Sequence, residues 1–397
     1  MRPARRRRRE PWYLFCGDAA FAEAQLVAEI RRCGDAGERA SLLHLLSRLG
    51  GWAPLAELLD RDGACLQHAD GRAALFHLQQ HQGHPNPWLA LLPAEQQGAF
   101  LQGWLPAVRQ GLPLEIRLGG GLGDQLEGLA LVAGINATRP GHQHCSVSLP
   151  ASSRAALEPL LEQRPAAALL PRYRFLADPE SSAPAEATAA WISLLPWRAL
   201  LAAHHLDEGA SGNGDPVALS LWGGWREATE RRPQLVVCWR TKVDRRERLW
   251  AHLRSLGFPQ ILATYRWLLP WAASQGIRVI DVTPYTPEEE RNLDSLPERE
   301  NLVALQSQLR SLADTAAEVA AAELVVSVDT ALIHLAHALQ CPRWLLLHRH
   351  GDARWRQRLQ QDGGSDHQQL RVLQQTVQDQ WHGPLGHLRA DLAELGL

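Results

Sequence analysis

Three polar residues near the end of the chain have the types and spacing of an anion-binding site. Asp329 and Thr330 follow the apolar run Leu324–Val328, and His334 comes four residues after Thr330. Residues four apart lie on nearly the same side of a helix, so Thr330 and His334 face one way. A helix that begins at Asp329-Thr330 attracts anions through its unpaired amides and its dipole. These groups suit a phosphate or diphosphate, although an ordinary capped helix with a solvated histidine explains the same residues.

A glycine-rich turn earlier in the chain places a carboxylate at the start of another expected helix. Residues 114–118 alternate as a strand does, and the sequence GGGLGDQ follows them. This turn is neither the GxGxxG fingerprint of dinucleotide sites nor a P-loop, because no lysine follows its last glycine. Asp124 is therefore either a simple N-cap or a carboxylate at the floor of a cleft. Four glycines allow positive φ angles and close approach of a ligand to the backbone: Gly119, Gly120, Gly121 and Gly123.

A basic turn follows a third apolar segment. Residues 235–239 predict a buried strand, and Arg240, Thr241 and Lys242 come directly after it. Two cations and a hydroxyl at the carboxyl end of a strand would neutralise phosphates. A solvated basic turn is the other interpretation.

Strand and helix signals alternate around these three turns. After the strand at residues 324–328, apolar residues recur every three or four positions, as on the packed side of a helix. Cys341-Pro342 ends that helix, and residues 344–347 predict a second buried strand. A strand, a helix and a strand in succession indicate a parallel sheet, and the glycine turn is set in a similar unit. The predicted fold class is therefore α/β.

The first hundred residues differ from the rest because they carry helical periodicity only. Across residues 11–110, short amphipathic segments alternate with glycine-containing breaks such as Gly50-Gly51. Stacked helix pairs, as in helical repeats, explain this spacing, and a plain helical cap on the next domain explains it equally well. Residues 1–10 contain six arginines and predict a disordered basic tail, with a weak contact to membrane or nucleic acid as the alternative.

The composition is that of an ordinary globular protein with more than one domain. The 397 residues exceed what one core usually serves, and 45% of them are hydrophobic. A net charge of −2 gives no electrostatic reason to expect nucleic acid as a partner. The six cysteines lack metal-ligand spacing and are typical of thiols in a reducing compartment. No apolar run approaches the roughly 18–20 residues that span a bilayer, so we expect no transmembrane segment.

These patterns divide the chain into four parts. The tail covers residues 1–10, and the helical region covers residues 11–110. A first α/β domain is expected at residues 111–215, ending in the polar segment ASGNGDP. A second α/β domain is expected at residues 216–397, and its last part, from 352 onward, predicts one or two terminal helices.

Three segments resemble bacterial glycosyltransferases of family 9, which are related to the heptosyltransferases and are often fused to tetratricopeptide repeats. Residues 312–347, LADTAAEVAAAELVVSVDTALIHLAHALQCPRWLLL, resemble the C-terminal motif of that family. Residues 119–132, GGGLGDQLEGLALV, are similar to its N-terminal GxGLGDQ turn. Residues 191–196, WISLLP, resemble its Ser-Leu-Pro segment before the interdomain linker. One departure is the turn at residues 239–242, WRTK, where repeat-fused relatives carry Trp-x-Gly-Asn-Pro.

The resemblance implies a GT-B architecture, in which two Rossmann-like domains face each other across a cleft. It implies transfer of a sugar from a nucleotide-sugar donor with inversion, and no metal or cofactor. Asp124 falls at the position proposed in relatives for the catalytic base. The residues that the resemblance assigns to the donor diphosphate are Asp329, Thr330 and His334, with Thr241, Lys242 and Arg240 in the turn that often adds phosphate contacts.

Our main hypothesis is an inverting, metal-independent glycosyltransferase that acts on a hydroxyl of a glycan, a lipid-linked glycan or a protein. The alternative is a degenerate transferase that serves as a protein- or glycan-binding scaffold, and the altered turn at residues 239–242 motivates it. A dinucleotide-dependent oxidoreductase fits less well, because the glycine turn lacks the fingerprint. We expect a cytoplasmic protein, with peripheral contact at the inner membrane face left open, and a surface for a protein partner on the N-terminal helices.

Overall fold

The computed structural model describes residues 19–84, 87–94, 97, 114–138, 146–162, 170, 173–177, 190–192, 233–242, 248–304, 309, 311–349, 351, 355, 370–377 and 380–395. The predicted basic tail at residues 1–10 and the polar segment at residues 210–216 lie outside these ranges.

The N-terminal region is helical, as its periodicity predicts. Its elements are α1 (Ala19–Arg32), α2 (Ala36–Leu49), α3 (Trp52–Arg61), α4 (Ala69–His81) and two 3₁₀ segments, η2 (Gly63–Gln67) and η3 (Pro87–Leu91). The carboxylate of Asp35 caps α2 by accepting a 2.7 Å hydrogen bond from the amide of Glu38. Gly50 ends α2 with φ 81°, a left-handed conformation that glycine adopts without the Cβ penalty of other residues.

The first α/β unit begins with the strand that precedes the glycine turn. It contains β1 (Leu114–Arg117), α7 (Leu122–Thr138), β2 (Ser146–Pro150), the 3₁₀ segment η5 (Ala151–Ser153), α8 (Arg154–Leu161), β3 (Tyr173–Leu176) and β4 (Ala190–Ile192). The strands are parallel and lie in the order β3-β2-β1-β4. The predicted packed side of α7 is confirmed, because Leu126, Leu129, Ala130 and Ala133 are buried.

The second α/β unit has a six-stranded parallel sheet in the order β10-β9-β8-β5-β6-β7. Its strands are β5 (Gln234–Cys238), β6 (Arg278–Asp281), β7 (Leu302–Ala304), β8 (Leu324–Val328), β9 (Arg343–Leu347) and β10 (Leu370–Gln374). Its helices are α11 (Arg248–Leu253), α12 (Phe258–Ser274), α13 (Pro287–Leu293), the 3₁₀ segment η7 (Arg299–Asn301), α14 (Leu312–Ala320), α15 (Ala331–Ala338) and α17 (His382–Leu395). Strands β5, β8 and β9 are buried along their whole length, which explains their largely apolar sequences.

Both sheets have the strand order of a Rossmann fold. Numbered from its own first strand, the second sheet has the order 3-2-1-4-5-6, and the first sheet has its first four strands in the order 3-2-1-4. In such sheets ligands bind outside the carboxyl ends of the strands, at the point where the strand order reverses. The reversal lies between β1 and β4 in the first sheet and between β5 and β8 in the second.

One expectation for the C-terminus is wrong. Residues 370–374 were expected among terminal helices and turns, but they form β10, which pairs with β9 along its length. The segment is partly exposed, as an edge strand is, and the neighbouring glutamines weaken its apolar pattern. The terminal helix itself is present as α17.

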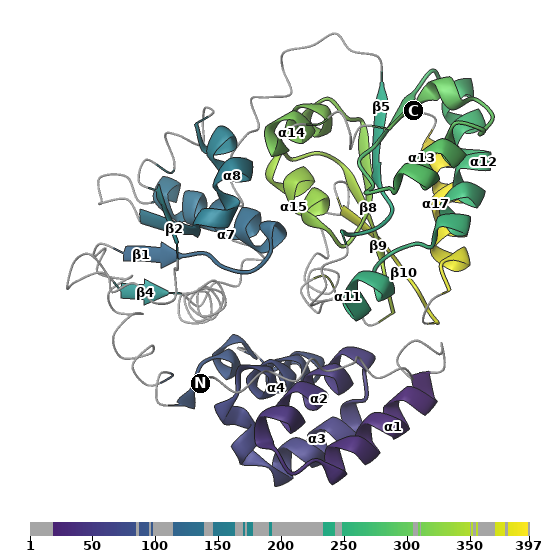
Figure 1. Cartoon of the computed structure of the whole chain (residues 1–397). Coiled ribbons are helices and arrows are strands. Elements are labelled where there is room, and N and C mark those ends of the chain that lie inside the picture. The colour runs from purple at the N-terminus through teal and green to yellow at the C-terminus, as the bar shows by residue number, and fades with distance from the viewer. Residues whose placement is uncertain are drawn as a thin grey trace.

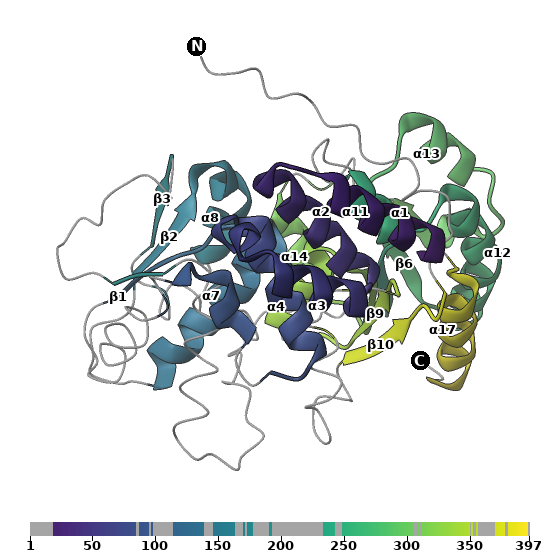
Figure 2. The same cartoon turned by 90° about the horizontal axis from the view of Figure 1, so that it is seen from below.

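The two units face each other through their helices, with α7 and α8 of the first against α15 and α14 of the second (Figure 1). The helical region lies beneath both units in Figure 1 and overlaps both when seen from below (Figure 2). This is the predicted GT-B class, two Rossmann-like units facing each other and preceded by an all-α region. None of the helices among the described residues has the length and apolar character needed to cross a membrane.

Two buried clusters join the parts. One contains Phe76 and Leu92 from the helical region, Leu126 from the first unit and Leu335 from the second. The core of the helical region includes Leu253, which belongs to α11 of the second unit. Burying each such side chain stabilises the fold by about 1.5–3 kcal/mol, so the three parts pack as one structure.

Candidate active site

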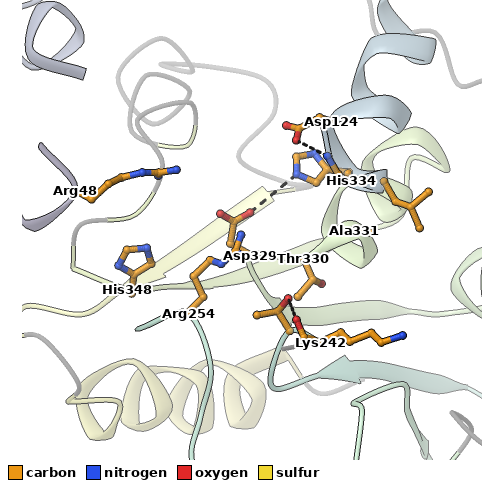
Figure 3. Close-up of a pocket in the computed structure, with 13 residues that line it drawn as sticks. Arg48, Asp124, Lys242, Arg254, Asp329, Thr330, Ala331, His334 and His348 are labelled. Atoms are coloured by element: carbon orange, nitrogen blue, oxygen red, sulfur yellow. Dashed lines mark hydrogen bonds and ion pairs between the residues drawn. The ribbon is translucent and has the colours of Figure 1, made fainter. Parts of the chain in front are cut away.

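A pocket of about 420 Å³ lies where the three parts meet (Figure 3). This volume is in the range of small-molecule sites. The residues that line it come from α2, from the glycine turn and α7, and from turns and helix α15 of the second unit: Arg48, Gly121, Leu122, Gly123, Asp124, Thr241, Lys242, Arg254, Asp329, Thr330, Ala331, His334 and His348.

The start of α15 forms one wall of this pocket. Thr330 is the N-cap, and its Oγ1 accepts a 3.3 Å hydrogen bond from the amide of Leu332. Thr330 Oγ1 also lies 3.0 Å from Ser327 Oγ, so the hydroxyl is held at the carboxyl end of β8. Because the first amides of a helix have no partner within the helix, this wall is suited to an anion.

A hydrogen bond from a buried tryptophan holds the side chain of Asp329 in place. Its side chain is buried, and Oδ1 accepts a 3.0 Å hydrogen bond from the indole Nε1 of Trp355. The same oxygen lies 4.0 Å from Nε2 of His334. Asp329 therefore orients two aromatic rings as well as lining the site.

His334 is buried between the two α/β units and is not solvated, so the simpler interpretation of this residue is wrong. Its side chain is 6% exposed, and Nδ1 lies 3.9 Å from Glu127 Oε2 on α7. The imidazole packs at 5.1 Å from the Trp355 ring. A Cβ atom added to Gly123 would lie 2.6 Å from His334 Cδ2, so the close approach of α7 to α15 requires glycine at this position.

The glycine turn aims Asp124 into the pocket. Gly120 has φ +77°, and a Cβ atom there would lie 2.8 Å from Asp124 Oδ2. That oxygen accepts a 3.1 Å hydrogen bond from the amide of Gly121, and the side-chain amide of Gln125 donates to the carbonyl of Gly120. Gly121 and Gly123 line the pocket, whereas Gly119 and Gly120 shape the turn without lining it.

Of the three residues predicted in the turn after β5, two line the pocket and one does not. Thr241 and Lys242 line the pocket, and the amide of Thr241 donates a 3.1 Å hydrogen bond to Ser255 Oγ. Arg240 does not line the pocket. Its guanidinium forms hydrogen bonds of 2.9 and 2.5 Å with the two carboxylate oxygens of Glu289 and lies over the ring of Tyr285. The cation of Arg240 thus fixes the turn to the start of α13.

Cys238, which ends β5 beneath this turn, is not a nucleophile. Its thiol donates to the carbonyl of Arg240 at 3.3 Å. Burial raises the pKa of Cys238 to about 12, with the nearby Asp281 adding to the shift, so the sulfur stays protonated at neutral pH.

Three polar residues of the pocket were not identified from the sequence. His348 directly follows β9, and the rule that ligands bind beyond the carboxyl ends of parallel strands would have found it. Arg254 comes just after α11, and Arg48 lies on α2 in the helical region. No sequence signal connects these two helices with the site, because only tertiary packing brings them to it.

The pocket has more positive than negative groups. Arg48, Lys242 and Arg254 are cations at neutral pH, whereas Asp124 and Asp329 are its carboxylates. No group of three or more His, Cys, Asp and Glu side chains with the arrangement of a metal site occurs in the described part of the chain. The arrangement can hold an anion of two or more charges while presenting a carboxylate from the opposite unit.

Comparison with known proteins identifies relatives of the second unit. Residues 230–357 match the family model for glycosyltransferase family 9 (heptosyltransferase). No curated protein matches the sequence.

Three solved structures are similar to the chain. The E. coli heptosyltransferase WaaC with ADP is 16% identical, with a TM-score of 0.40 over 71% of this chain and 98% of its own. E. coli ADP-heptose LPS heptosyltransferase II is 15% identical, with a TM-score of 0.42 over 72% of this chain and 100% of its own. The glycosyl transferase family 9 protein from Veillonella parvula is 10% identical, with a TM-score of 0.44 over 72% and 96%. The second unit of the chain is therefore similar in sequence to glycosyltransferase family 9, the heptosyltransferase family, over residues 230–357.

Proposed function

We propose that the chain is an inverting, metal-independent transferase that moves a sugar from a nucleoside-diphosphate sugar to an acceptor hydroxyl. The observation that carries this proposal is the shared pocket. Asp124 comes from the first α/β unit, Thr330 and the start of α15 come from the second, and both line the same cavity.

Asp124 is proposed as the general base. As the acceptor oxygen attacks the anomeric carbon, its proton passes to the Asp124 carboxylate, and attack from the face opposite the leaving group inverts that carbon. Proton transfer to a positioned side chain contributes typically about 10²–10⁴-fold to the rate. The hydrogen bond from the Gly121 amide to Asp124 Oδ2 holds the carboxylate in place for this step.

The diphosphate is proposed to leave at the start of α15. The bond from the anomeric carbon to the phosphate oxygen breaks, and the electron pair stays on that oxygen. The Ala331 amide at the start of α15, the positive end of the helix dipole, the Thr330 hydroxyl and the Lys242 ammonium stabilise the developing charge. This positive potential takes the place of a divalent cation, and we expect undiminished transfer in excess EDTA.

The acceptor class remains as proposed from the sequence: a hydroxyl on a glycan, a lipid-linked glycan or a protein. We also propose a cytoplasmic location, for which the cysteines in the described residues give some support. Cys33, Cys65, Cys238 and Cys341 are free thiols, as is usual in a reducing compartment.

A second candidate function is a binding scaffold that has lost turnover. The observation in its favour is Arg240, whose guanidinium is taken up by Glu289 and does not enter the pocket. In this case the chain would bind a glycan or a polypeptide without a nucleotide preference.

A screen of nucleotide sugars and nucleoside diphosphates separates the two functions. The melting temperature of the full chain is measured with each compound, and stabilising donors are tested for transfer to glycan acceptors. The transferase predicts that one nucleotide family raises the melting temperature and that Thr330→Ala abolishes the effect. If none of the compounds changes the melting temperature, the result contradicts the proposed function.

A further inference from the structure

The helical region contributes a side chain to the pocket. Arg48 lies on α2 and lines the cavity together with Asp124 and Thr330, which belong to the two α/β units. In Figure 3 its side chain reaches from the helical region toward Asp329. The site is therefore built from three parts of the chain.

The packing of the helical region fixes the position of Arg48. Leu46 and Leu49, on either side of it in sequence, are buried in the core of the helical region. Leu253 at the end of α11 is 1% exposed and is part of the same core. The next residue, Arg254, lines the pocket. The contact that attaches the helical region to the second unit thus also places two arginines at one cavity.

The hydrogen-bond donors of the pocket fall into two sets. In Figure 3, Arg48, Arg254 and His348 lie on one side of Asp329, and Thr330 and Lys242 lie on the other. The second set lies at the start of α15 and in the turn after β5, and it is already assigned to the leaving diphosphate. Arginine forms paired hydrogen bonds with phosphate or carboxylate oxygens, and His348 is 2% exposed with its ring at the cavity wall.

We propose that Arg48, Arg254 and His348 form a second anion subsite, for which the helical region supplies the arginine that completes it. The ligand is a phosphate-type or carboxylate anion carried by a substrate. This inference rests on the proposed function, since that function supplies two substrates and both can carry such a group. The helical region is then a wall of the active site and sets its specificity.

Calorimetric titration of the full chain with inorganic pyrophosphate tests the subsite without knowledge of the substrates. Arg48→Gln should weaken pyrophosphate binding about tenfold, as expected for the loss of charge-assisted hydrogen bonds. The matched control is Arg31→Gln in the same region, because the Arg31 side chain is 56% exposed and pairs with Glu57 outside the pocket. This control should bind pyrophosphate as the wild type does.

Equal affinity for wild type and Arg48→Gln, at unchanged melting temperature, overturns the inference. So does a wild-type chain that does not bind pyrophosphate. If Arg48→Gln fails to fold, Arg254→Gln provides the same test from the other side of the subsite. A loss of binding in Thr330→Ala with none in Arg48→Gln leaves the proposed function standing and rejects only the second subsite.

Steady-state kinetics with an identified donor then show which substrate carries the anion. A KM for the donor raised by Arg48→Gln assigns the subsite to the donor, and a raised KM for the acceptor assigns it to the acceptor. Unchanged KM values for both substrates contradict the inference. If Arg48→Gln weakens pyrophosphate binding but the wild-type chain transfers no sugar, the subsite is supported and the proposed function is not.

Discussion

At the scale of single residues, the chemistry depends on a carboxylate and an anion site that come from different units. Asp124 is fixed by the backbone of its own turn, and Thr330 is fixed by Ser327 and by the amide that it caps. Neither residue depends on the other for its position. Substitutions should therefore separate the proton transfer from the binding of the donor.

Replacing the proposed base should slow transfer strongly and spare binding. Asp124→Asn keeps the size of the side chain but removes its capacity to accept a proton, so we expect the transfer rate to fall about 10²–10⁴-fold. Donor affinity, measured by calorimetry, should change little. A variant that transfers at the wild-type rate would remove Asp124 from the mechanism.

Much of the site could be predicted at this scale, because the relevant residues follow strands. Asp124, Thr241, Lys242, Asp329, Thr330 and His334 all line the pocket. Arg240 shows the limit of the method. Arg240 and Lys242 lie in the same basic turn, so the sequence predicts a phosphate contact for both. Only the structure shows that the Arg240 guanidinium forms a hydrogen bond with Glu289. Their catalytic roles remain predictions.

At the scale of elements, the contact between α7 and α15 brings the two halves of the site together. Gly123→Ala should disturb it, because the new Cβ atom would lie 2.6 Å from the buried ring of His334. Either the imidazole moves or the helices separate, at a cost of about 1–3 kcal/mol in the free energy of unfolding. Chemical denaturation measures this loss.

The matched control is Gly119→Ala in the same turn. A Cβ atom at Gly119 has no neighbour within 4 Å. Its free energy of unfolding should remain close to that of the wild type. Equal stability of both variants would show that the helices tolerate the extra methyl group and would reject the steric account.

The ion pair between Arg240 and Glu289 should make the turn after β5 sensitive to acid. Burial of Glu289 raises its pKa, but hydrogen bonds from Arg240 and Thr286 outweigh this effect and hold the pKa below its ordinary value. A carboxyl group with a lowered pKa stabilises the fold above its unfolded pKa of 4.5, and this contribution is lost as the pH falls through the folded pKa. Glu289→Gln should therefore cost about 1–2 kcal/mol at pH 7 and nothing in strong acid.

Urea unfolding of Glu289→Gln between pH 7 and pH 3 measures this difference. Glu288→Gln provides the control, because Glu288 lies in the same helical turn and is exposed. A difference between wild type and Glu289→Gln that stays constant as the pH falls would contradict the assignment.

Element by element, strong periodicity predicted the fold well and weak periodicity predicted it poorly. The buried runs of β5, β8 and β9 and the packed side of α7 were found because their sequences leave one structural interpretation. β3 and β10 were missed. Both are short and partly exposed strands whose charged residues interrupt the apolar pattern.

At the scale of the whole molecule, the helical region is joined to the second unit through α11. Sequence periodicity could not distinguish a separate repeat domain from a cap on the next domain, because both bury an amphipathic face. The structure shows Leu253 of α11 within the helical core, which is the contact expected of a cap.

Leu253→Ala should loosen the helical region from the rest of the chain. Truncating a buried leucine lowers the free energy of unfolding by about 2–5 kcal/mol. Here the lost packing is between the helical region and the second unit. Scanning calorimetry should show an early transition of the helical region that is absent from the wild type. Transfer should weaken in parallel, since Arg254 is the adjacent residue.

Leu256→Ala is the comparison for this variant. Leu256 is 1% exposed, as Leu253 is, but it belongs to the core of the second unit alone. Its truncation should lower the melting temperature without producing the early transition. The same calorimetric profile for both variants would mean that Leu253 does not join the two parts.

The most direct measurement is a crystal structure of the full chain with the nucleoside diphosphate that emerges from the screen. The account predicts diphosphate oxygens within hydrogen-bonding distance of Thr330 Oγ1 and the amide of Ala331, with Asp124 facing them across the pocket. A nucleotide bound away from the start of α15, or a diphosphate that Asp124 cannot face, would contradict the account.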